Sequence, residues 1–192
     1  MFVWSMRINL KLIIQFHYEC SRLMRNQIFD IKQEIASCNN EKLKDILIRD
    51  KENFDKTFLD TLQSNTFLMM YSYLEEFLYS VRGIYSCETE LGDRGSIKRF
   101  KRVFVDCLGI DLEKDLEWKF ICDCEKIRDC LLHANGRVDL SKDKKSLENI
   151  VSCSNDLLRI DLKRIVITDR FLEEVNNVLW SFLTRVESRE TS

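Results

Sequence analysis

The chain has 192 residues, 45% of them hydrophobic and 32% charged, with a formal net charge of −2 and a pI near 5.8. This composition is typical of one soluble domain over residues 1–192, and it excludes a protein that binds polyanions over its whole surface. Proline is absent and glycine occurs five times, so we expect α-helix over most of the chain.

The first half of the chain predicts long helices. Apolar residues recur at helical spacing from about residue 5 to 37 and again from 41 to 62. The N-terminal stretch is apolar, but Arg7 and Lys11 interrupt it, so it is too short for a membrane span and predicts a core helix. Ser64 to Thr66 offers a cap or a slight break before residues 67–85, whose apolar residues lie on more than one side and predict a central helix.

The second half predicts shorter elements. After the turn signals Gly92 and Gly95 we expect a basic helix over 97–108, a helix over 115–134 that ends at Asn135-Gly136, and a short helix near 146–153. Residues 157–168 alternate and predict a small β-hairpin, and residues 169–187 predict a closing helix. The predicted fold is all-α, a bundle of about five or six helices with a small hairpin near 157–168.

Eight cysteines are scattered along the predicted helices, with no signal peptide before them. This scatter favours reduced thiols in a cytoplasmic protein over a disulfide framework. Cys122 and Cys124 are two positions apart on a helix, hence about 200° apart around its axis, and they cannot converge on one metal ion. We expect neither a metal site nor a cofactor.

A basic stretch runs from residue 94 to 102, and its five cations are Arg94, Lys98, Arg99, Lys101 and Arg102. Such a run is usually a solvated helix face. In a chain of negative net charge it is also the densest candidate for contact with a phosphate backbone. We therefore expect it to border any nucleic-acid cleft.

The most informative segment is RDCLLHANGRVD, from Arg128 to Asp139. It places Arg128 five residues before His133, one of only two histidines in the chain. Asp129 lies one helical turn before His133, so its carboxylate can orient the imidazole. A cation for phosphate and an imidazole that titrates near neutrality are what a metal-free ribonuclease needs.

The helix predicted over 115–134 has a second apolar face beside its ordinary core face. Large apolar residues share this second face with Arg128, Asp129 and His133, and they are Trp118, Ile121, Cys122 and Leu132. The mixture predicts a half-buried surface, either a cleft or a dimer seam. Arg128 projects about 140° away from His133, so two copies packed across a two-fold axis would form a shared site more simply than one copy.

Each of these residues also has an ordinary explanation when it is taken alone. An arginine beside an aspartate is usually a surface ion pair, and Asn135-Gly136 alone is a helix cap. A lone histidine is usually a satisfied surface residue or a partner of a helix C-terminus, and His17 is interpreted in this way.

The string IRDCLLHANGRVD, Ile127 to Asp139, resembles the signature of the HEPN superfamily, named for higher eukaryotes and prokaryotes nucleotide-binding domains. It is most similar to HEPN proteins of bacterial abortive-infection and toxin–antitoxin systems, whose motif continues in an LxHxNGxxD-like pattern. The matching positions are Leu131, His133, Asn135, Gly136 and Asp139. The upstream segment YSYLEEFL, residues 71–78, also looks like the helix that precedes the motif, and the order of elements agrees over about residues 60–187.

The resemblance implies a metal-independent endoribonuclease. In this reading His133 moves the proton of the ribose 2′-hydroxyl or of the leaving oxygen, and Arg128 holds the scissile phosphate. Asp129 orients His133, Asn135 contacts phosphate, and Glu75 has a supporting role. Lys98, Arg99, Lys101 and Arg102 contribute substrate contacts. The implied partners are RNA, a second copy of the chain, and an antitoxin such as a nucleotidyltransferase-like protein.

Two other classes of function stay open. The first is a catalytically silent HEPN-like module that binds a partner or acts as a sensor subunit. The second is a structural helical interaction protein in which Arg128 and Asp129 are only a surface pair. Toxicity on expression that depends on His133, or a neighbouring gene for a nucleotidyltransferase-like antitoxin, would favour the nuclease.

Overall fold

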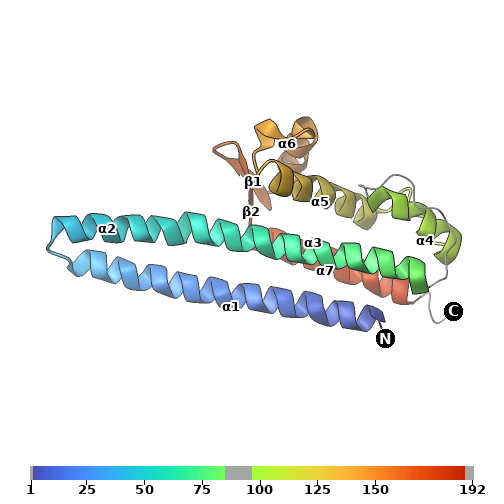
Figure 1. Ribbon diagram of the computed structural model, residues 1–192, viewed down its shortest axis with the longest axis horizontal. Helices are drawn as coiled ribbons and strands as arrows, with labels where there is room; N and C mark the ends of the chain where they lie inside the picture. Colours follow the sequence, from blue (N-terminus) through green and yellow to red (C-terminus); the bar gives the residue numbers. More distant parts are fainter. Residues whose placement is uncertain (1, 85–96, 189–192) are drawn as a thin grey trace.

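The computed structural model describes the chain at residues 2–84 and 97–188, with side chains from residue 7 to 83 and from 97 to 188. Its longest elements lie antiparallel (Figure 1): α1 (Phe2–Ser37) on one side, and on the other α2 (Glu41–Glu52), a π-helical segment (Asn53–Phe58) and α3 (Leu59–Ile84). Asn40 caps the N-terminus of α2, since its side-chain oxygen accepts hydrogen bonds from the N–H groups of Lys42 and Leu43. α2, the π-helical segment and α3 form one continuous helical rod over residues 41–84.

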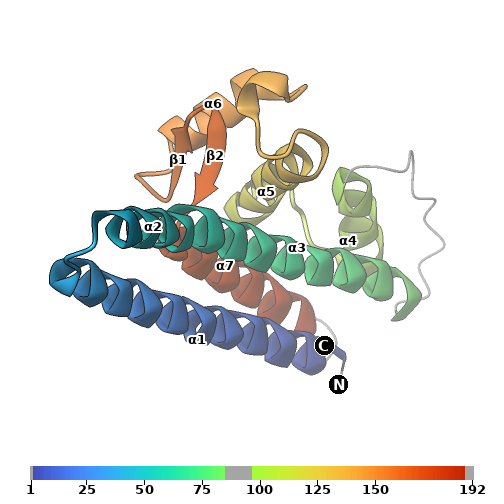
Figure 2. The same ribbon diagram turned by 60° about the vertical axis from the view of Figure 1, so that its left-hand side comes forward.

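The remaining helices pack around this pair. The last helix, α7 (Asp169–Glu187), contacts α1, α3 and α5. α5 (Leu116–His133) crosses over α3, with α4 (Lys101–Leu108) toward one end of it and α6 (Lys144–Ser152) toward the other (Figure 2). Short 3₁₀ turns, Ile97–Phe100 and Val138–Leu140, precede α4 and α6. α5 is therefore held between α3, α7 and the elements at its two ends.

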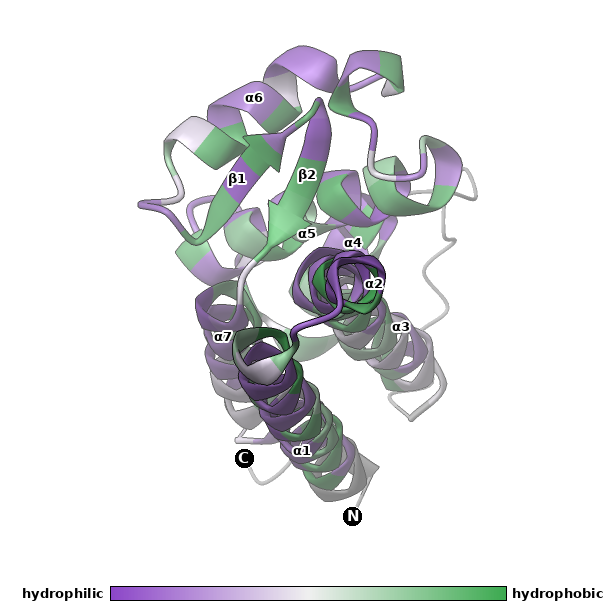
Figure 3. Ribbon diagram, turned by 90° about the vertical axis from the view of Figure 1, so that its left-hand side faces the viewer, coloured by the Kyte–Doolittle hydropathy of each residue, from purple (hydrophilic) through white to green (hydrophobic). Residues whose placement is uncertain are grey.

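A two-stranded antiparallel hairpin stands beside the C-terminal end of α5. Its strands are β1 (Leu158–Asp161) and β2 (Arg164–Ile167), with Leu158 opposite Ile167 and Asp161 opposite Arg164. The last three residues of β2, from Ile165 to Ile167, are buried, and this end of the strand has the colour of hydrophobic residues in the view along the long axis (Figure 3). The hairpin thus extends the core to the end of the predicted motif helix.

Buried residues from every helix except α2, and from both strands, form one hydrophobic cluster. Its largest fully buried side chains include Phe67 and Phe77 of α3, Phe104 of α4 and Phe182 of α7. The rings of Trp118, Phe104 and Phe182 meet with centroids 5.3 to 5.9 Å apart. This aromatic cluster joins α4, α5 and α7.

The predicted all-helical bundle with a small hairpin is confirmed, and several details are corrected. No break occurs at Ser64 to Thr66, because α3 passes through these residues, and the irregular turn is the π-helical segment at 53–58. Gly92, Gly95 and Arg94 lie outside the described residues. Cys107 is disulfide-bonded, which contradicts the expectation of reduced thiols throughout, while the other six cysteines of the described residues are free.

Candidate active site

Local sequence fixes both ends of the motif helix. Asp115 caps the N-terminus of α5, and its carboxylate accepts the N–H of Trp118 at 2.8 Å. At the other end Asn135 and Gly136 adopt positive φ angles of 50° and 73°, and the N–H of Gly136 returns to the carbonyl of Cys130 at 3.0 Å. Glycine and asparagine tolerate this left-handed backbone best. The predicted stop of the helix at Asn135-Gly136 is therefore real, and His133 is its last residue.

Arg128 is half-buried and faces α3. Its guanidinium donates to the carboxylate of Asp129 at 2.9 Å and to that of Glu75 at 3.4 Å, and it lies 5.8 Å from the ring centroid of Tyr71. Burial alone would lower the pKa of Arg128, but the hydrogen bond to Asp129 and the charges of the two carboxylates raise it above its usual value. Arg128 is a permanent cation here, and Glu75, for which only a supporting role was expected, is one of its two carboxylate neighbours.

Asp129 does not orient His133 in this structure. Its carboxylate is occupied by Arg128 and lies 3.6 Å from the ammonium of Lys142. Among the described residues no hydrogen bond joins Asp129 to His133. The predicted one-turn contact fails because a neighbouring arginine and a lysine from the next loop compete for the same oxygens.

His133 is exposed at the edge of a small cleft of about 260 Å³. The cleft is lined by Asp129, His133, Ala134, Leu140, Ser141 and Lys142. The imidazole makes no hydrogen bond or ion pair with the part of the chain that the structure describes, so both ring nitrogens are available to a ligand. Lys142, with 77% of its side chain exposed, supplies a cation beside it that was not predicted, since it comes from a loop after the motif.

Asn135 faces away from that cleft. It lines a second, larger pocket of about 470 Å³ on the hairpin side of the turn. Its backbone carbonyl accepts a hydrogen bond from the guanidinium of Arg164, and the N–H of Ile165 donates to the carbonyl of Gly136 at 2.9 Å. The turn at 133–136 thus separates two pockets and is tied to β2.

The basic stretch does not border the His133 cleft. Lys98 and Lys101 line a different cleft of about 530 Å³ beside the N-terminal half of α5, together with Lys119 and Lys126. On α5, Lys126 and Lys119 of this cleft precede His133 by 7 and 14 residues, or about 10 and 20 Å along the helix, and none of the cleft's residues lines the His133 cleft. Lys101 pairs with Glu113, and Arg102 is exposed. The expectation that this stretch adjoins the motif is therefore wrong.

Arg99 is not part of a solvated face either. Its guanidinium lies 5.1 Å from the ring centroids of both Tyr79 and Phe100, and it donates a hydrogen bond to the Tyr79 hydroxyl. It packs α3 against the 3₁₀ turn before α4. Arg99 therefore has a structural role in the fold.

The second apolar face of α5 is mostly covered within the chain. Trp118, Ile121 and Cys122 are buried, with at most 9% of each residue exposed, and the Trp118 ring packs against Phe104 of α4 and Phe182 of α7. Leu132, next to His133, is 51% exposed. The apolar surface that suggested a dimer seam is thus reduced to the C-terminal end of the helix.

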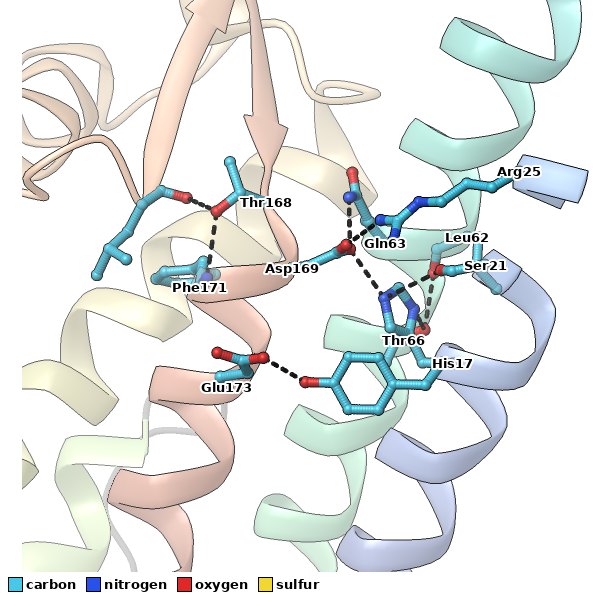
Figure 4. Close-up of polar contacts among 12 residues, drawn as sticks. His17, Ser21, Arg25, Leu62, Gln63, Thr66, Thr168, Asp169, Phe171 and Glu173 are labelled. Carbon is cyan, nitrogen blue, oxygen red and sulfur yellow. Dashed lines mark hydrogen bonds and ion pairs between the residues drawn. The ribbon is translucent and has the colours of Figure 1, made fainter. Parts of the chain in front are cut away.

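His17 was expected to be a surface residue or a partner of a helix C-terminus, and this prediction is wrong. It is completely buried in the middle of α1, where Nδ1 lies 3.1 Å from the Thr66 hydroxyl and Nε2 lies 3.0 Å from the Asp169 carboxylate (Figure 4). Thr66 directs its own hydrogen to the carbonyl of Leu62 at 2.8 Å. The Ser21 hydroxyl lies 3.4 Å from Nε2, so both ring nitrogens have polar partners inside the bundle.

Asp169 is the centre of this buried cluster. Besides His17 it accepts hydrogen bonds from Gln63 at 2.8 Å and from Arg25, so that α1, α3 and α7 meet at one carboxylate (Figure 4). The hydrogen bond from His17 holds the pKa of Asp169 well below its usual range, against the effect of burial and with the help of Gln63 and Arg25. His17, Gln63 and Arg25 all contact the one carboxylate, which is the arrangement of a structural junction.

The described residues contain no group of three or more His, Cys, Asp or Glu side chains arranged to hold a metal ion. Within the same residues, no helix is both long enough and apolar enough to cross a membrane. No protein-family model matches the chain, and no curated protein or solved structure matches it significantly.

Proposed function

We propose that this chain is a metal-independent endoribonuclease of the HEPN type, a toxin or abortive-infection effector in bacterial defence. The observation that supports it most is the position of His133, at the end of α5, with both ring nitrogens unoccupied by described residues and the cation of Lys142 lining the same cleft. An imidazole that is free to exchange a proton beside a cation is suited to general acid–base work on a phosphodiester.

The proposed reaction begins at the ribose 2′-hydroxyl. A neutral His133 takes its proton, the 2′-oxygen attacks the adjacent phosphorus, and the bond from phosphorus to the 5′-oxygen breaks. The leaving oxygen receives a proton from the imidazolium so formed or from His133 of a second copy. Arg128 and Lys142 stabilise the negative charge on the phosphoryl oxygens. The products are a 2′,3′-cyclic phosphate and a 5′-hydroxyl.

Arg128 can serve this reaction only if it exchanges partners or comes from another subunit. It pairs with Asp129 and Glu75 and is not among the residues that line the His133 cleft. We therefore propose a homodimer across the exposed end of α5 at Leu132, so that Arg128 of one copy reaches the cleft of the other. A nucleotidyltransferase-like antitoxin and a cytoplasmic location belong to the same proposal.

The test is cleavage of a mixed RNA substrate in EDTA by the purified chain, with end-group analysis of the products. The proposal predicts metal-free cleavage with cyclic phosphate and 5′-hydroxyl ends, and loss of cleavage in His133→Ala. Activity that disappears in the chelator, or that persists in His133→Ala, would contradict it. Expression in bacteria should arrest growth, and His133→Ala should relieve the arrest.

The second candidate is a catalytically silent HEPN-like module that binds a partner. It is favoured by the occupied state of Arg128, whose two carboxylate neighbours neutralise the cation that a phosphate would require. This module would bind RNA or a partner protein without cleaving RNA. Neither the wild-type chain nor His133→Ala would then show cleavage.

A further inference from the structure

The pocket beside Asn135 is formed by three separate parts of the chain. Its walls are one face of the rod that joins the π-helical segment to α3, the end of α5, and the tip and second strand of the hairpin. The volume of about 470 Å³ lies in the range of small-molecule sites. The hairpin makes this pocket, because without β2 the end of α5 would face solvent.

The pocket has an apolar floor and a polar rim. The floor is half-buried or buried and consists of Leu68, Leu131, Ile165 and Val166. The rim carries hydroxyl and amide groups from one helical face and from the motif turn, namely Thr57, Thr61, Ser64, Asn65 and Asn135. Two cations of the rim, Lys56 and Arg164, are matched by two carboxylates, Asp60 and Asp161. Such a pocket suits a flat, uncharged group with several hydrogen-bonding edges.

The tip of the hairpin is strained, and it borders this pocket. Leu162 and Lys163 occupy the two turn positions with φ angles of 45° and 68°, where hairpins normally carry Asn-Gly or Asp-Gly. A leucine in left-handed backbone is unfavourable. Leu162 is also 88% exposed at the rim of the pocket. The position of Leu162 at the rim leaves its side chain free to cover a ligand that lies on the apolar floor.

We infer that this pocket binds the base and ribose of one nucleotide of an RNA, with Leu162 closing over the base. The apolar floor takes the face of the base, and the amides and hydroxyls of the rim contact its edge and the ribose. Aliphatic side chains cover the face of any base without regard to its identity, whereas an amide such as Asn65 distinguishes donors from acceptors. The pocket is therefore the element that selects the nucleotide.

This inference rests on the proposed function, because it places the bound nucleotide next to the scissile phosphate. His133 and Ala134 line one side of the turn, and Asn135 and Gly136 line the other. An RNA strand that crosses the turn would place its phosphate at His133 and the neighbouring nucleoside in the hairpin pocket. The sequence preference of cleavage would then be read by the hairpin and α3.

The experiment measures binding of the four nucleoside 5′-monophosphates to the full-length His133→Ala chain by calorimetry, with amide NMR shifts to locate the site. Ribose 5-phosphate is the control without a base. We expect one or more monophosphates to bind with shifts at Asn65, Asn135 and Leu162, and ribose 5-phosphate to bind at least about tenfold more weakly. Because the readout is binding, it does not depend on cleavage.

The variant Leu162→Asn separates the effect of Leu162 on the stability of the turn from its effect on ligand binding in the pocket. Asparagine tolerates left-handed backbone, so the variant should keep or raise the melting temperature. It should weaken binding of the monophosphate about tenfold, since a leucine side chain buried against a ligand contributes at least that factor. Lys163→Asn is the matched control, because it relaxes the other turn position but Lys163 does not line the pocket. It should leave binding unchanged.

Three results would overturn the inference: no binding of any monophosphate at about 10 mM, equal binding of ribose 5-phosphate, or equal affinity in wild type and Leu162→Asn. The proposed function fails by a different result, namely the absence of RNA cleavage by the wild-type chain. If monophosphates bind and RNA is not cut, the nucleotide pocket stands and the silent module becomes the better account.

Discussion

The two histidines of this chain have opposite surroundings. His17 is completely buried and has a polar partner for each ring nitrogen, whereas His133 is exposed and without a partner among the described residues. A satisfied buried ring stabilises a junction, and an unsatisfied exposed ring can exchange protons with a ligand. Of the two, only His133 is placed for acid–base chemistry.

At the junction, Asp169 should make stability depend on pH in acid. Its pKa is lowered in the folded state from about 3.9 in the unfolded chain, so its contribution is complete above about pH 5 and is lost as pH falls toward the folded pKa. The difference in unfolding free energy between wild type and Asp169→Asn, from urea titrations at pH 2 to 5, should shrink as pH falls.

Glu174→Gln is the control for this measurement. Glu174 is exposed on the same helix and has no hydrogen bond or ion pair with the residues that the structure describes. Its replacement should leave the pH profile of wild type unchanged. A difference between wild type and Asp169→Asn that stayed constant from pH 2 to 5 would contradict the assignment of a lowered pKa to Asp169.

At the scale of elements, α5 is fixed at both ends. Asp115 caps its N-terminus and pairs with Arg185 of α7, and the hairpin holds its C-terminal turn through Arg164 and Ile165. The predicted site residues are therefore carried by a helix that is anchored to α7 at one end and to β2 at the other. A site on such a helix keeps its geometry without a ligand.

Two variants of Asp115 separate the contribution of the helix cap to stability from that of the ion pair between Asp115 and Arg185. Asp115→Ala removes both and should lower the free energy of unfolding by about 1 to 2 kcal/mol. Asp115→Asn keeps a side-chain oxygen for the N–H of Trp118 and loses only the charge, so it should cost less. Urea denaturation of both variants measures the two effects. Equal losses would mean that the ion pair with Arg185, and not the cap, stabilises this end.

Hydrophobic spacing and helix stop signals predicted the helices well, because both depend only on residues that are close together in the sequence. The 3.6-residue period marked α1, α3, α5 and α7, and Asn135-Gly136 marked the end of α5. The π-helical segment at 53–58 was missed, since its residues fit the ordinary helical pattern. The hairpin was predicted from its alternation, although its turn residues, Leu162 and Lys163, give no turn signal.

The site was predicted only in part, because its contacts are tertiary. Spacing placed Asp129 near His133, but Lys142 and Arg128 take the Asp129 carboxylate. Charge density along the chain suggested one basic surface, whereas Arg99 packs on two rings and Lys101 pairs with an acid. The role of His17 depends on Asp169, 152 residues later. A pattern within a short stretch of sequence does not predict such tertiary contacts.

At the scale of the whole molecule, a chain of net charge −2 needs a localised cationic surface to bind RNA. Among the described residues, two clefts carry cations near α5. One holds Lys142 beside His133, and the other, along the first half of α5, holds Lys98, Lys101, Lys119 and Lys126 together with Glu113, Asp115 and Asp123. Along the helix, Lys126 of the second cleft lies about 10 Å from His133 and Lys119 lies about 20 Å from it. An RNA that contacts both clefts would run along α5, with its cleavage point at one end.

Binding along α5 should show in the dependence on salt. Lys98 and Arg102 are exposed, and their joint replacement by alanine should weaken RNA binding and reduce the slope of log K against log salt by about 1 to 2. Replacing Lys32 and Lys42, which are exposed on α1 and α2, is the matched control. Binding isotherms at several salt concentrations give both slopes. Equal slopes in the two double variants would remove α5 from the RNA path.

The most direct test of the account is the paired loss of Arg128 and His133 in one RNA cleavage assay run in EDTA. If both act on the same phosphate, Arg128→Ala and His133→Ala should each reduce cleavage by orders of magnitude, and the double variant should be little worse than the poorer single variant. Asp129→Asn should do less, since Asp129 touches Arg128 and Lys142 rather than His133. Full cleavage by His133→Ala, or additive losses in the double variant, would contradict a shared site.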